Sequence, residues 1–281
     1  MTTLERDGYQ KCRYRRGFTV RSQVKWVPFL TREFSLNRQL RRVRSILRTG
    51  LRGTIRLAVR LVVISEGLSE GASVSSQVTR EHILQVGLNL ASTEGLCKIT
   101  FGSVAKRASL SKGGVVGHFP HLGDLKRAIL GVALDLWSRT CLGVDTGVGG
   151  GLPSLIRYLN VWIGWTRRAG LPGSCPLAQA IVELSFLPGP VREAAAAAES
   201  VWRQTLIMLI RDAIDKRHLL QDTDVAQLAW DLLGIYLSHH VSSHSLRDPD
   251  ADRKAQFSVK RLVASIEPTS ESAAHYRRGG Q

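Results

Sequence analysis

Apolar residues between positions 79 and 140 recur every three or four positions, which is the period of an amphipathic helix. Turn-forming residues divide this pattern into segments: Gly95 ends the first run, Ser109 and Ser111 flank a short turn, and Pro120 ends the third run. Thr100 stands where its hydroxyl can cap the second run. We therefore predict four helices, at residues 79–93, 101–108, 112–119 and 122–140.

The second and third predicted helices have the lengths and the connecting turn of a helix-turn-helix. The N-terminal end of the second helix in such a pair can enter the DNA major groove, which is about 12 Å wide. Here that end reads Ser111-Lys112-Gly113-Gly114. Lys112 can donate to a phosphate or a guanine, Ser111 and His118 can donate to a phosphate, and the two glycines let the backbone approach closely. The alternative is a pair of short helices with a purely structural role.

The back half of the chain is also predicted to be helical, so the predicted fold class is all-α. A Gly-rich stretch at residues 143–153 lacks the Gly-Lys-Ser/Thr sequence of a phosphate-binding loop, and we interpret it as a connection. Asp248 and Pro249 are predicted to open the last helix, as its cap and its first residue. The predicted helices beyond the Gly-rich stretch lie at residues 155–168, 176–187, 190–218, 222–240 and 249–266.

A specific set of residues lies at fixed spacings over about 60 positions of the chain: Arg80, Ile83-Leu84, Leu90-Ala91, Glu94-Gly95, Ile99-Thr100, Val104-Ala105, Ala108, Leu110-Ser111-Lys112-Gly113-Gly114, His118-Phe119, Leu125 and Ile129. With these residues, positions 79–140 resemble the DNA-binding domain of the TetR (tetracycline-repressor) family of bacterial transcriptional regulators. A looser resemblance, at residues 173–192, is to ligand-binding domains of some members.

The resemblance implies an N-terminal three-helix helix-turn-helix domain and a C-terminal helical bundle that binds a ligand and dimerises. A homodimer would present two recognition helices about 34–36 Å apart to a palindromic operator in double-stranded DNA. Its last two helices would form the interface, with Leu228, Leu232, Ile235 and Leu262 as candidates. The residues expected to bind DNA, within the helix-turn-helix at residues 100–119, are Thr100, Phe101, Ser111, Lys112, Gly113, Gly114, Val116 and His118.

Four positions depart from the family pattern. Val116 replaces a usual Tyr, and Leu122 replaces a usual Lys, so two expected contacts to the DNA backbone are missing. Ser109 replaces a usual Gly, and Phe101 replaces a common Thr. We expect the DNA affinity or the preferred site to differ from the family's because of Val116 and Leu122.

Positive charge is concentrated at the start of the chain. The formal net charge is +16, of which residues 1–78 contribute +11, residues 79–140 contribute +4 and residues 141–281 contribute +1. Arginines at four-residue spacing from Arg44 to Arg60 fit an amphipathic helix that binds nucleic acid or a membrane surface. We favour the alternative, a poorly ordered extension upstream of a non-Met start such as Val74 or Val78.

These observations together give the expected domain organisation. Residues 1–78 form the basic extension, residues 79–140 the DNA-binding domain, residues 141–268 the effector-binding and dimerisation domain, and residues 269–281 a disordered tail. No apolar run approaches the roughly 18 residues of a membrane span, and no secretory signal is recognisable. Four dispersed cysteines fit free thiols in a reducing compartment, so we expect a cytoplasmic protein without membrane partners.

Other conspicuous residues in the back half have two interpretations each. Trp162, Trp165 and Trp202 are candidates for binding a small-molecule effector, although aromatic residues at helical spacing usually belong to the core. His240 and His244 have the spacing of a metal pair but lack a nearby carboxylate or thiol in the sequence, so a histidine cluster at a dimer seam is favoured. Cys175 is a redox-sensor candidate or an inert thiol.

Two classes of function remain. The first is a dimeric, ligand-responsive DNA-binding regulator, most simply a repressor that an effector releases from its operator. The second is a helical-bundle interaction protein or an enzyme that does not bind DNA. The sequence contains no nucleophile–base set, acidic pair, metal motif or nucleotide loop, so we expect a non-enzyme without cofactor or metal ion.

Overall fold

The computed structural model describes residues 74–143 and 149–268 of the chain. These residues form helices and connecting loops, with no β-strand among them, so the predicted all-α class is confirmed. The predictions for residues 1–73 and for the tail at 269–281 lie outside the described residues. No helix in the described ranges has both the length and the apolar character needed to cross a membrane.

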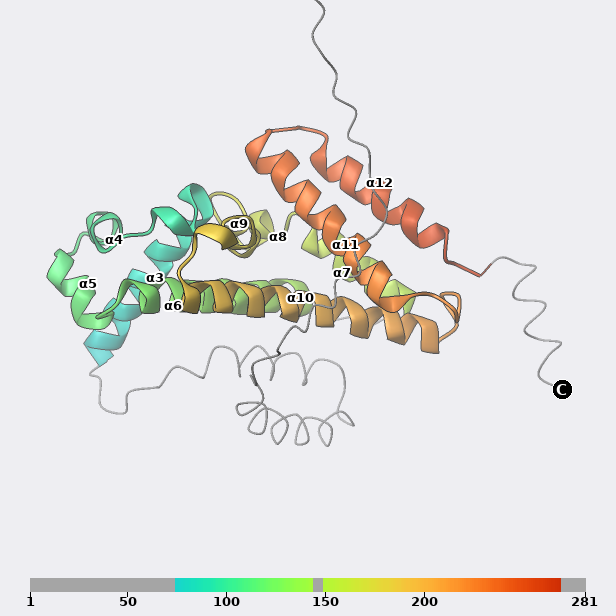
Figure 1. The fold of residues 1–281 in the computed structure, drawn as a ribbon, viewed down its shortest axis with the longest axis horizontal. Helices are drawn as coiled ribbons and strands as arrows, with labels where there is room; N and C mark the ends of the chain where they lie inside the picture. The colour runs from blue at the N-terminus through green and yellow to red at the C-terminus, as the bar shows by residue number, and fades with distance from the viewer. Residues whose placement is uncertain (1–73, 144–148, 269–281) are drawn as a thin grey trace, which may run out of the picture. The chain divides into compact units, whose positions relative to one another are not determined.

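The N-terminal part consists of four α-helices and one 3₁₀ turn (Figure 1). The first helix begins at residue 74 rather than 79, because residues 74–78, which we assigned to the basic extension, continue it. The 3₁₀ turn was not predicted. In chain order the elements are α3 (Val74–Glu94), η3 (Leu96–Lys98), α4 (Phe101–Ala108), α5 (Lys112–His118) and α6 (Leu122–Leu142).

Close packing of α3 against α6 organises this part. Ile83 and Leu88 on α3 and Leu125 and Ile129 on α6 are completely buried. Gly87 permits the close approach, because a side chain at this position would overlap Ile129. The α6 helix continues past α3 and also packs against α7, α8, α9 and α10, so one helix belongs to both parts of the molecule.

The C-terminal part is a helical bundle in which α10 is the central element. It packs against α6, α7, α9 and α11, while α12 packs mainly on α11 (Figure 1). The elements are α7 (Leu152–Trp162), α8 (Trp165–Arg168), α9 (Pro176–Val182), η4 (Leu184–Phe186), α10 (Gly189–Asp215), α11 (Val225–His240), the π-helical turn η5 (Val241–Ser245) and α12 (Ala251–Ala264).

Several predicted helix limits were wrong, and three of the differences have identifiable reasons. The helix predicted at 155–168 is two helices, because the chain turns at Ile163 and at Gly164, whose φ is +79°. The helix predicted at 176–187 gives way to the 3₁₀ turn η4 after Val182. The last helix begins at Ala251 rather than at Pro249, because the Asp248 carboxylate accepts from the Asp250 N–H (2.9 Å) in a turn ahead of the helix.

Candidate nucleic-acid interface

A reciprocal capping box fixes the start of α4. The Ser103 N–H donates to Thr100 Oγ1 (3.0 Å), and the Thr100 N–H donates to Ser103 Oγ (2.9 Å). Both hydrogen bonds satisfy backbone donors that a helix start leaves unpaired. The Thr100 hydroxyl proton is not used by the cap, and Thr100 is exposed, so it can donate outward.

The turn between α4 and α5 is tight and contains a strained residue. Ser109 has φ 57° and ψ 37°, a left-handed conformation that favours glycine. The Leu110 N–H donates to Ala105 O (3.0 Å) and closes the turn. This conformation explains why glycine would be preferred at position 109, where Ser109 departs from the family pattern.

The start of α5 is the exposed end of the helix-turn-helix. The Ser111 hydroxyl caps it by accepting from the Gly114 N–H (3.0 Å), while Ser111, Lys112, Gly113 and Gly114 are all exposed. Only Val115 of α5 is buried. The α5 helix is therefore anchored in the core through Val115, and its first turn is exposed to solvent, as insertion into a major groove requires.

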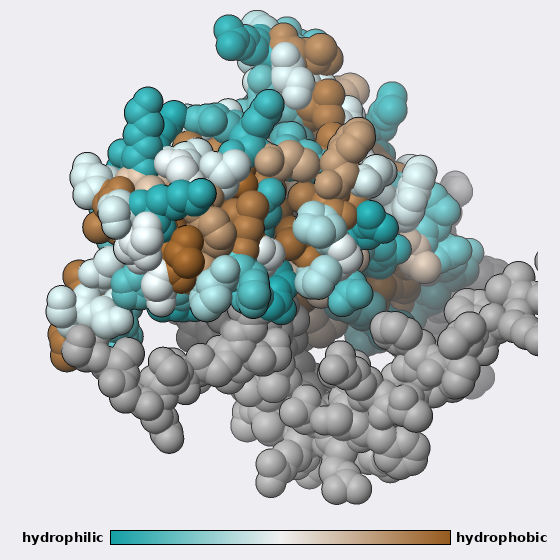
Figure 2. All heavy atoms as spheres, turned by 60° about the vertical axis from the view of Figure 1, so that its left-hand side comes forward, coloured by the Kyte–Doolittle hydropathy of each residue, from teal (hydrophilic) through white to brown (hydrophobic). Residues whose placement is uncertain are grey.

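The far end of α5 is held by Phe119, which is 2% exposed. The guanidinium carbon of Arg80 on α3 lies 4.6 Å from the centre of its ring, a cation–π contact. Val116 and His118 are half-buried on the same helix. Viewed from this side, the surface mixes hydrophilic side chains with small apolar patches (Figure 2).

The structure thus brings the predicted DNA-binding residues together on consecutive elements. Thr100 and the half-buried Phe101 lie at the start of α4, and Ser111, Lys112, Gly113, Gly114, Val116 and His118 lie at the cap and along α5. The assignment of these residues to DNA contacts stays a prediction. Leu122 opens α6 and is half-buried, so it adds apolar surface where a lysine would have added charge.

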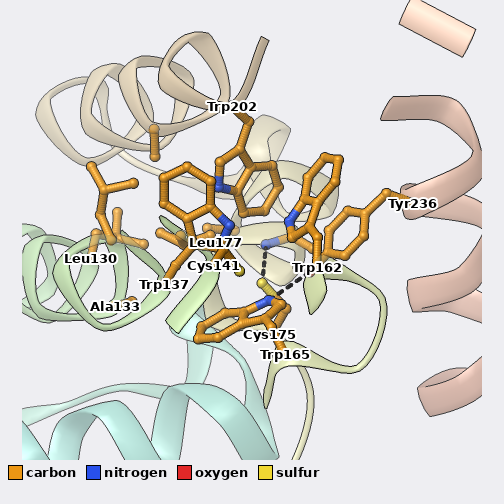
Figure 3. Packing of buried hydrophobic residues seen from close by; sticks show 14 of the residues in the cluster. Leu130, Ala133, Trp137, Cys141, Trp162, Trp165, Cys175, Leu177, Trp202 and Tyr236 are labelled. Carbon is orange, nitrogen blue, oxygen red and sulfur yellow. Dashed lines mark hydrogen bonds between the residues drawn. The ribbon is translucent and has the colours of Figure 1, made fainter. Parts of the chain in front are cut away.

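The three tryptophans proposed as ligand contacts lie elsewhere, inside the C-terminal bundle. Trp162 and Trp202 are fully buried and Trp165 is 1% exposed. The ring centres of Trp162 and Trp202 are 5.4 Å apart, and Trp165 Nε1 donates to Tyr236 Oη (2.8 Å) (Figure 3). Their role in ligand binding stays a prediction, and the aromatic cluster around them was not predicted.

A link between the two parts of the molecule was also missed by sequence reasoning. Ser92, near the end of α3, is 2% exposed and donates through Oγ to Ser174 O (2.7 Å). In return the Gly173 N–H donates to Ser92 Oγ (3.1 Å) and the Ser174 N–H donates to Ser92 O (2.8 Å). We call Ser92, Gly173 and Ser174 the clasp. It holds the loop before α9 against the DNA-binding part.

The other end of α9 makes a second link. The Cys97 N–H in η3 donates to Glu183 Oε2 (2.8 Å), and Gln179 Nε2 donates to Glu183 Oε1 (2.9 Å). Burial lowers the pKa of the neighbouring Lys126 ammonium, although the nearby Glu183 carboxylate opposes this shift. The sequence signal for this link, one glutamate after a short helix, is too weak to be recognised.

Two large aromatic side chains are exposed on the last two helices of the bundle. Trp230 on α11 is 64% exposed and Phe257 on α12 is 63% exposed. A groove of about 630 Å³ runs between these helices, lined by Trp230, Ile235 and Leu262 among others. The prediction was wrong for two of the four interface residues: Leu228 (4% exposed) and Leu232 (1% exposed) pack into the core of their own chain.

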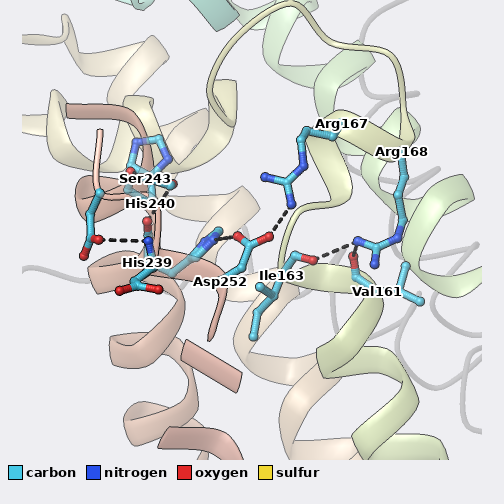
Figure 4. A network of polar contacts seen from close by, with 10 residues as sticks. Val161, Ile163, Arg167, Arg168, His239, His240, Ser243 and Asp252 are labelled. Carbon is cyan, nitrogen blue, oxygen red and sulfur yellow. Dashed lines mark hydrogen bonds and ion pairs between the residues drawn. The ribbon is translucent and has the colours of Figure 1, made fainter. Parts of the chain in front are cut away.

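The histidine cluster has the carboxylate partner that the sequence had not revealed. Asp252, from α12, lies 2.6 Å from His239 Nε2 and also pairs with Arg167 of α8 (Figure 4). Burial lowers the pKa of His240 to about 4, and the nearby His244 and His239 add to the shift. Within the described ranges no group of three or more His, Cys, Asp or Glu residues is arranged to hold a metal ion.

These features define a class: an all-helical protein with a helix-turn-helix domain joined to a larger helical bundle. Residues 151–259 match the family model described as "Tetracyclin repressor-like, C-terminal domain". A 50-residue stretch is 40% identical to the HTH-type transcriptional regulator AcrR of Shigella flexneri and covers 18% of this chain. That match spans only 23% of the AcrR sequence.

Solved structures show the same fold over most of the chain. A TetR-family transcriptional regulator from Cytophaga hutchinsonii aligns with a TM-score of 0.60 and 18% identity, covering 71% of this chain and all of its own. A regulator from Saccharomonospora viridis, solved in complex with choline, aligns with a TM-score of 0.58 and 19% identity, covering 69% and 100% of the two chains. Residues 151–259 therefore match a TetR-like C-terminal domain, and the fold is similar to that of solved TetR-family structures.

Proposed function

We propose that this protein is a homodimeric transcriptional regulator that binds a palindromic operator, acts as a repressor and is released by a small-molecule effector. The proposed domain limits are those given by the sequence: residues 79–140 bind DNA, and residues 141–268 bind the effector and dimerise. The observation that carries the proposal is the exposed first turn of α5, where Ser111, Lys112, Gly113 and Gly114 lie together at the surface.

Chemistry at this turn supports a duplex as the partner. The Lys112 ammonium and the hydroxyls of Thr100 and Ser111 are hydrogen-bond donors at the starts of adjacent helices, where backbone N–H groups also favour anions. Gly113 and Gly114 place no Cβ between the backbone and a groove wall. The two helix starts together suit a phosphate-lined groove.

The exposed groove between α11 and α12 supports the homodimer. Large aromatic side chains at more than 60% exposure are costly to leave in water, and a second copy of the same helices would cover them. A two-fold axis there would relate two α5 helices, which is the arrangement that a palindromic site demands. Ile235 and Leu262 line this groove and remain our predicted interface residues.

Binding to duplex DNA from the protein's own upstream region tests the proposal directly. We expect Lys112→Ala to weaken operator binding by about tenfold or more and to lower the slope of log affinity against log salt by about one. Lys260→Ala serves as the matched control, because Lys260 is an exposed lysine on α12. Equal operator affinity in the Lys112→Ala variant and the unmodified protein would refute the contact assignment. Absence of any salt-dependent binding would favour the interaction-protein alternative.

A further inference from the structure

Three helices direct aromatic side chains into one buried cluster inside the C-terminal bundle. Trp137 comes from α6, Tyr158 and Trp162 come from α7, and Trp202 comes from α10; none is more than 2% exposed. Their ring centres follow a closed circuit: 6.4 Å from Trp137 to Tyr158, 5.4 Å from Tyr158 to Trp162, 5.4 Å from Trp162 to Trp202 and 6.1 Å from Trp202 to Trp137. We call these four residues the aromatic ring cluster (Trp137, Trp162 and Trp202 are labelled in Figure 3).

The polar atom of every member of this cluster lacks a hydrogen-bond partner among residues 74–143 and 149–268. These atoms are the indole Nε1 of Trp137, Trp162 and Trp202 and the hydroxyl of Tyr158. The neighbouring Trp165 shows the usual arrangement, because its Nε1 donates to Tyr236 Oη. Buried side-chain donors are satisfied in the large majority of cases, and Phe would fill these places without an unpaired donor. Four buried, unpaired polar groups in one cluster therefore call for an acceptor from outside the described chain.

We propose that the aromatic ring cluster binds a neutral, flat aromatic compound that carries two or more hydrogen-bond acceptors, such as an aromatic ketone or an N-heteroaromatic. This inference rests on the effector role proposed above for the C-terminal domain. Indole N–H groups can only donate, so a ligand must accept from them. The ring edges and faces around the donors favour a flat aromatic guest, which gains stacking and edge-to-face contacts.

The surroundings of the cluster argue against a charged ligand. The other residues labelled near it in Figure 3 are aliphatic, aromatic or thiol side chains, among them Leu130, Leu177, Cys141 and Cys175. Burial raises the pKa of both thiols, so they are uncharged at neutral pH. An ion placed there would lose its hydration, and none of these labelled side chains carries a counter-charge.

The face of Trp162 is already covered, which argues against a cation held by ring faces. Trp162 stacks on Tyr236 with 4.0 Å between ring centres and 9° between planes. A guest must therefore displace at least one ring. Trp162 is suited to move, because it is the last residue of α7 and directly precedes the turn at Ile163 and Gly164.

The test uses the full chain without DNA and a matched pair of probes. Xanthone and xanthene share a tricyclic shape, but only xanthone has the carbonyl acceptor. Binding is followed by calorimetry and by tryptophan fluorescence. We expect xanthone to bind about 100-fold more tightly than xanthene, since its carbonyl oxygen can accept from two indole N–H groups and each hydrogen bond is worth about a factor of ten.

Variants that remove a donor but keep an aromatic ring locate the site. We expect Trp162→Phe and Trp202→Phe each to lower the xanthone affinity by roughly tenfold while changing the xanthene affinity little. Trp230→Phe, at the exposed surface of α11, should change neither affinity. If one cluster variant does not fold, Trp137→Phe provides the same comparison from a different helix.

Each remaining outcome decides against the proposal. Equal affinities for xanthone and xanthene would show that the donors do not contact the ligand. Tighter binding of choline than of xanthone would indicate a cation site, and failure of both xanthone and the smaller ketone chromone to bind would exclude the ligand class. The ligand test contains no DNA, so its result does not depend on operator binding. A protein that binds xanthone but no operator would overturn the regulator proposal and leave the ligand proposal standing.

Discussion

Ser109 shows how a single residue can carry backbone strain at the point where two functional helices meet. Its left-handed conformation costs an L-residue about 1–2 kcal/mol, and glycine would remove this cost but add about 0.4–1 kcal/mol through the entropy of the unfolded chain. We expect Ser109→Gly to raise the free energy of unfolding by about 0.5–1 kcal/mol, as measured by urea denaturation. Ser109→Ala keeps the strained conformation and should give no gain; a gain for Ala equal to that for Gly would contradict the explanation.

His240 makes a second prediction at this scale, concerning pH. Its folded-state pKa is lowered from 6.5 to about 4, mainly by burial, so the unfolded chain binds the additional proton between these values. Stability from this group is therefore complete above pH 6.5 and is lost as the pH falls toward 4. We expect the free energy of unfolding to drop by about 2 kcal/mol between pH 7 and pH 5.

Histidine variants separate this effect from general acid destabilisation. His240→Gln should flatten the dependence between pH 7 and pH 5, whereas His121→Gln, at an exposed position before α6, should leave it in place. His244, whose pKa burial also lowers, contributes in the same direction. The pKa values of Asp212 and Asp252 are also lowered, so these carboxylates are protonated only at lower pH. Their effect on the free energy of unfolding therefore falls below the range in which His240 titrates. An unchanged slope in His240→Gln would show that His240 is not the titrating group.

The short α9 helix is the element that ties the bundle to the DNA-binding part, through the clasp at one end and Glu183 at the other. Gly173 is the clasp residue that tolerates a larger side chain least, because a Cβ there would overlap the backbone carbonyl of Ser92. We expect Gly173→Ala to lower the free energy of unfolding by about 1–3 kcal/mol. Faster hydrogen exchange at the end of α3 should accompany this loss.

Gly189→Ala is the matched control for the clasp, since open space surrounds that position at the start of α10. It should be close to neutral in stability and in exchange at α3. If Gly173→Ala were equally neutral, the loop before α9 would be free to move away from Ser92, and the clasp could not couple the two parts.

The elements that were predictable from the sequence are those determined by neighbouring residues. The α4 helix and the starts of α5 and α6 follow from Thr100, Ser111 and Pro120, which act over one turn of helix. The break at Gly164 and the clasp were not predictable, because each depends on a partner far along the chain or on a conformation that glycine permits but does not dictate. Leu228 and Leu232 fit an apolar stripe that could equally face the core or a second subunit, and only the packing of α11 on α10 decides between them.

At the scale of the whole molecule, the surface left by α11 and α12 determines whether two recognition helices can act together. Trp230 and Phe257 remain exposed after α11 has packed on α10 and α12, so they are available to a second copy. We expect Trp230→Glu to convert a dimer to a monomer in analytical ultracentrifugation, because the carboxylate would be buried without a partner in the two-fold interface.

Operator binding should fail with the dimer even though α5 is untouched. A monomer contacts one half-site, and loss of the linked second contact lowers the apparent affinity by roughly 100-fold or more. Phe186→Glu is the control: Phe186 is 82% exposed on η4, outside the α11–α12 groove, and its substitution should preserve both the dimer and DNA binding. A Trp230→Glu protein that stays dimeric and still binds the operator would move the interface to another face, and the two α5 helices would then need a different axis to reach one duplex.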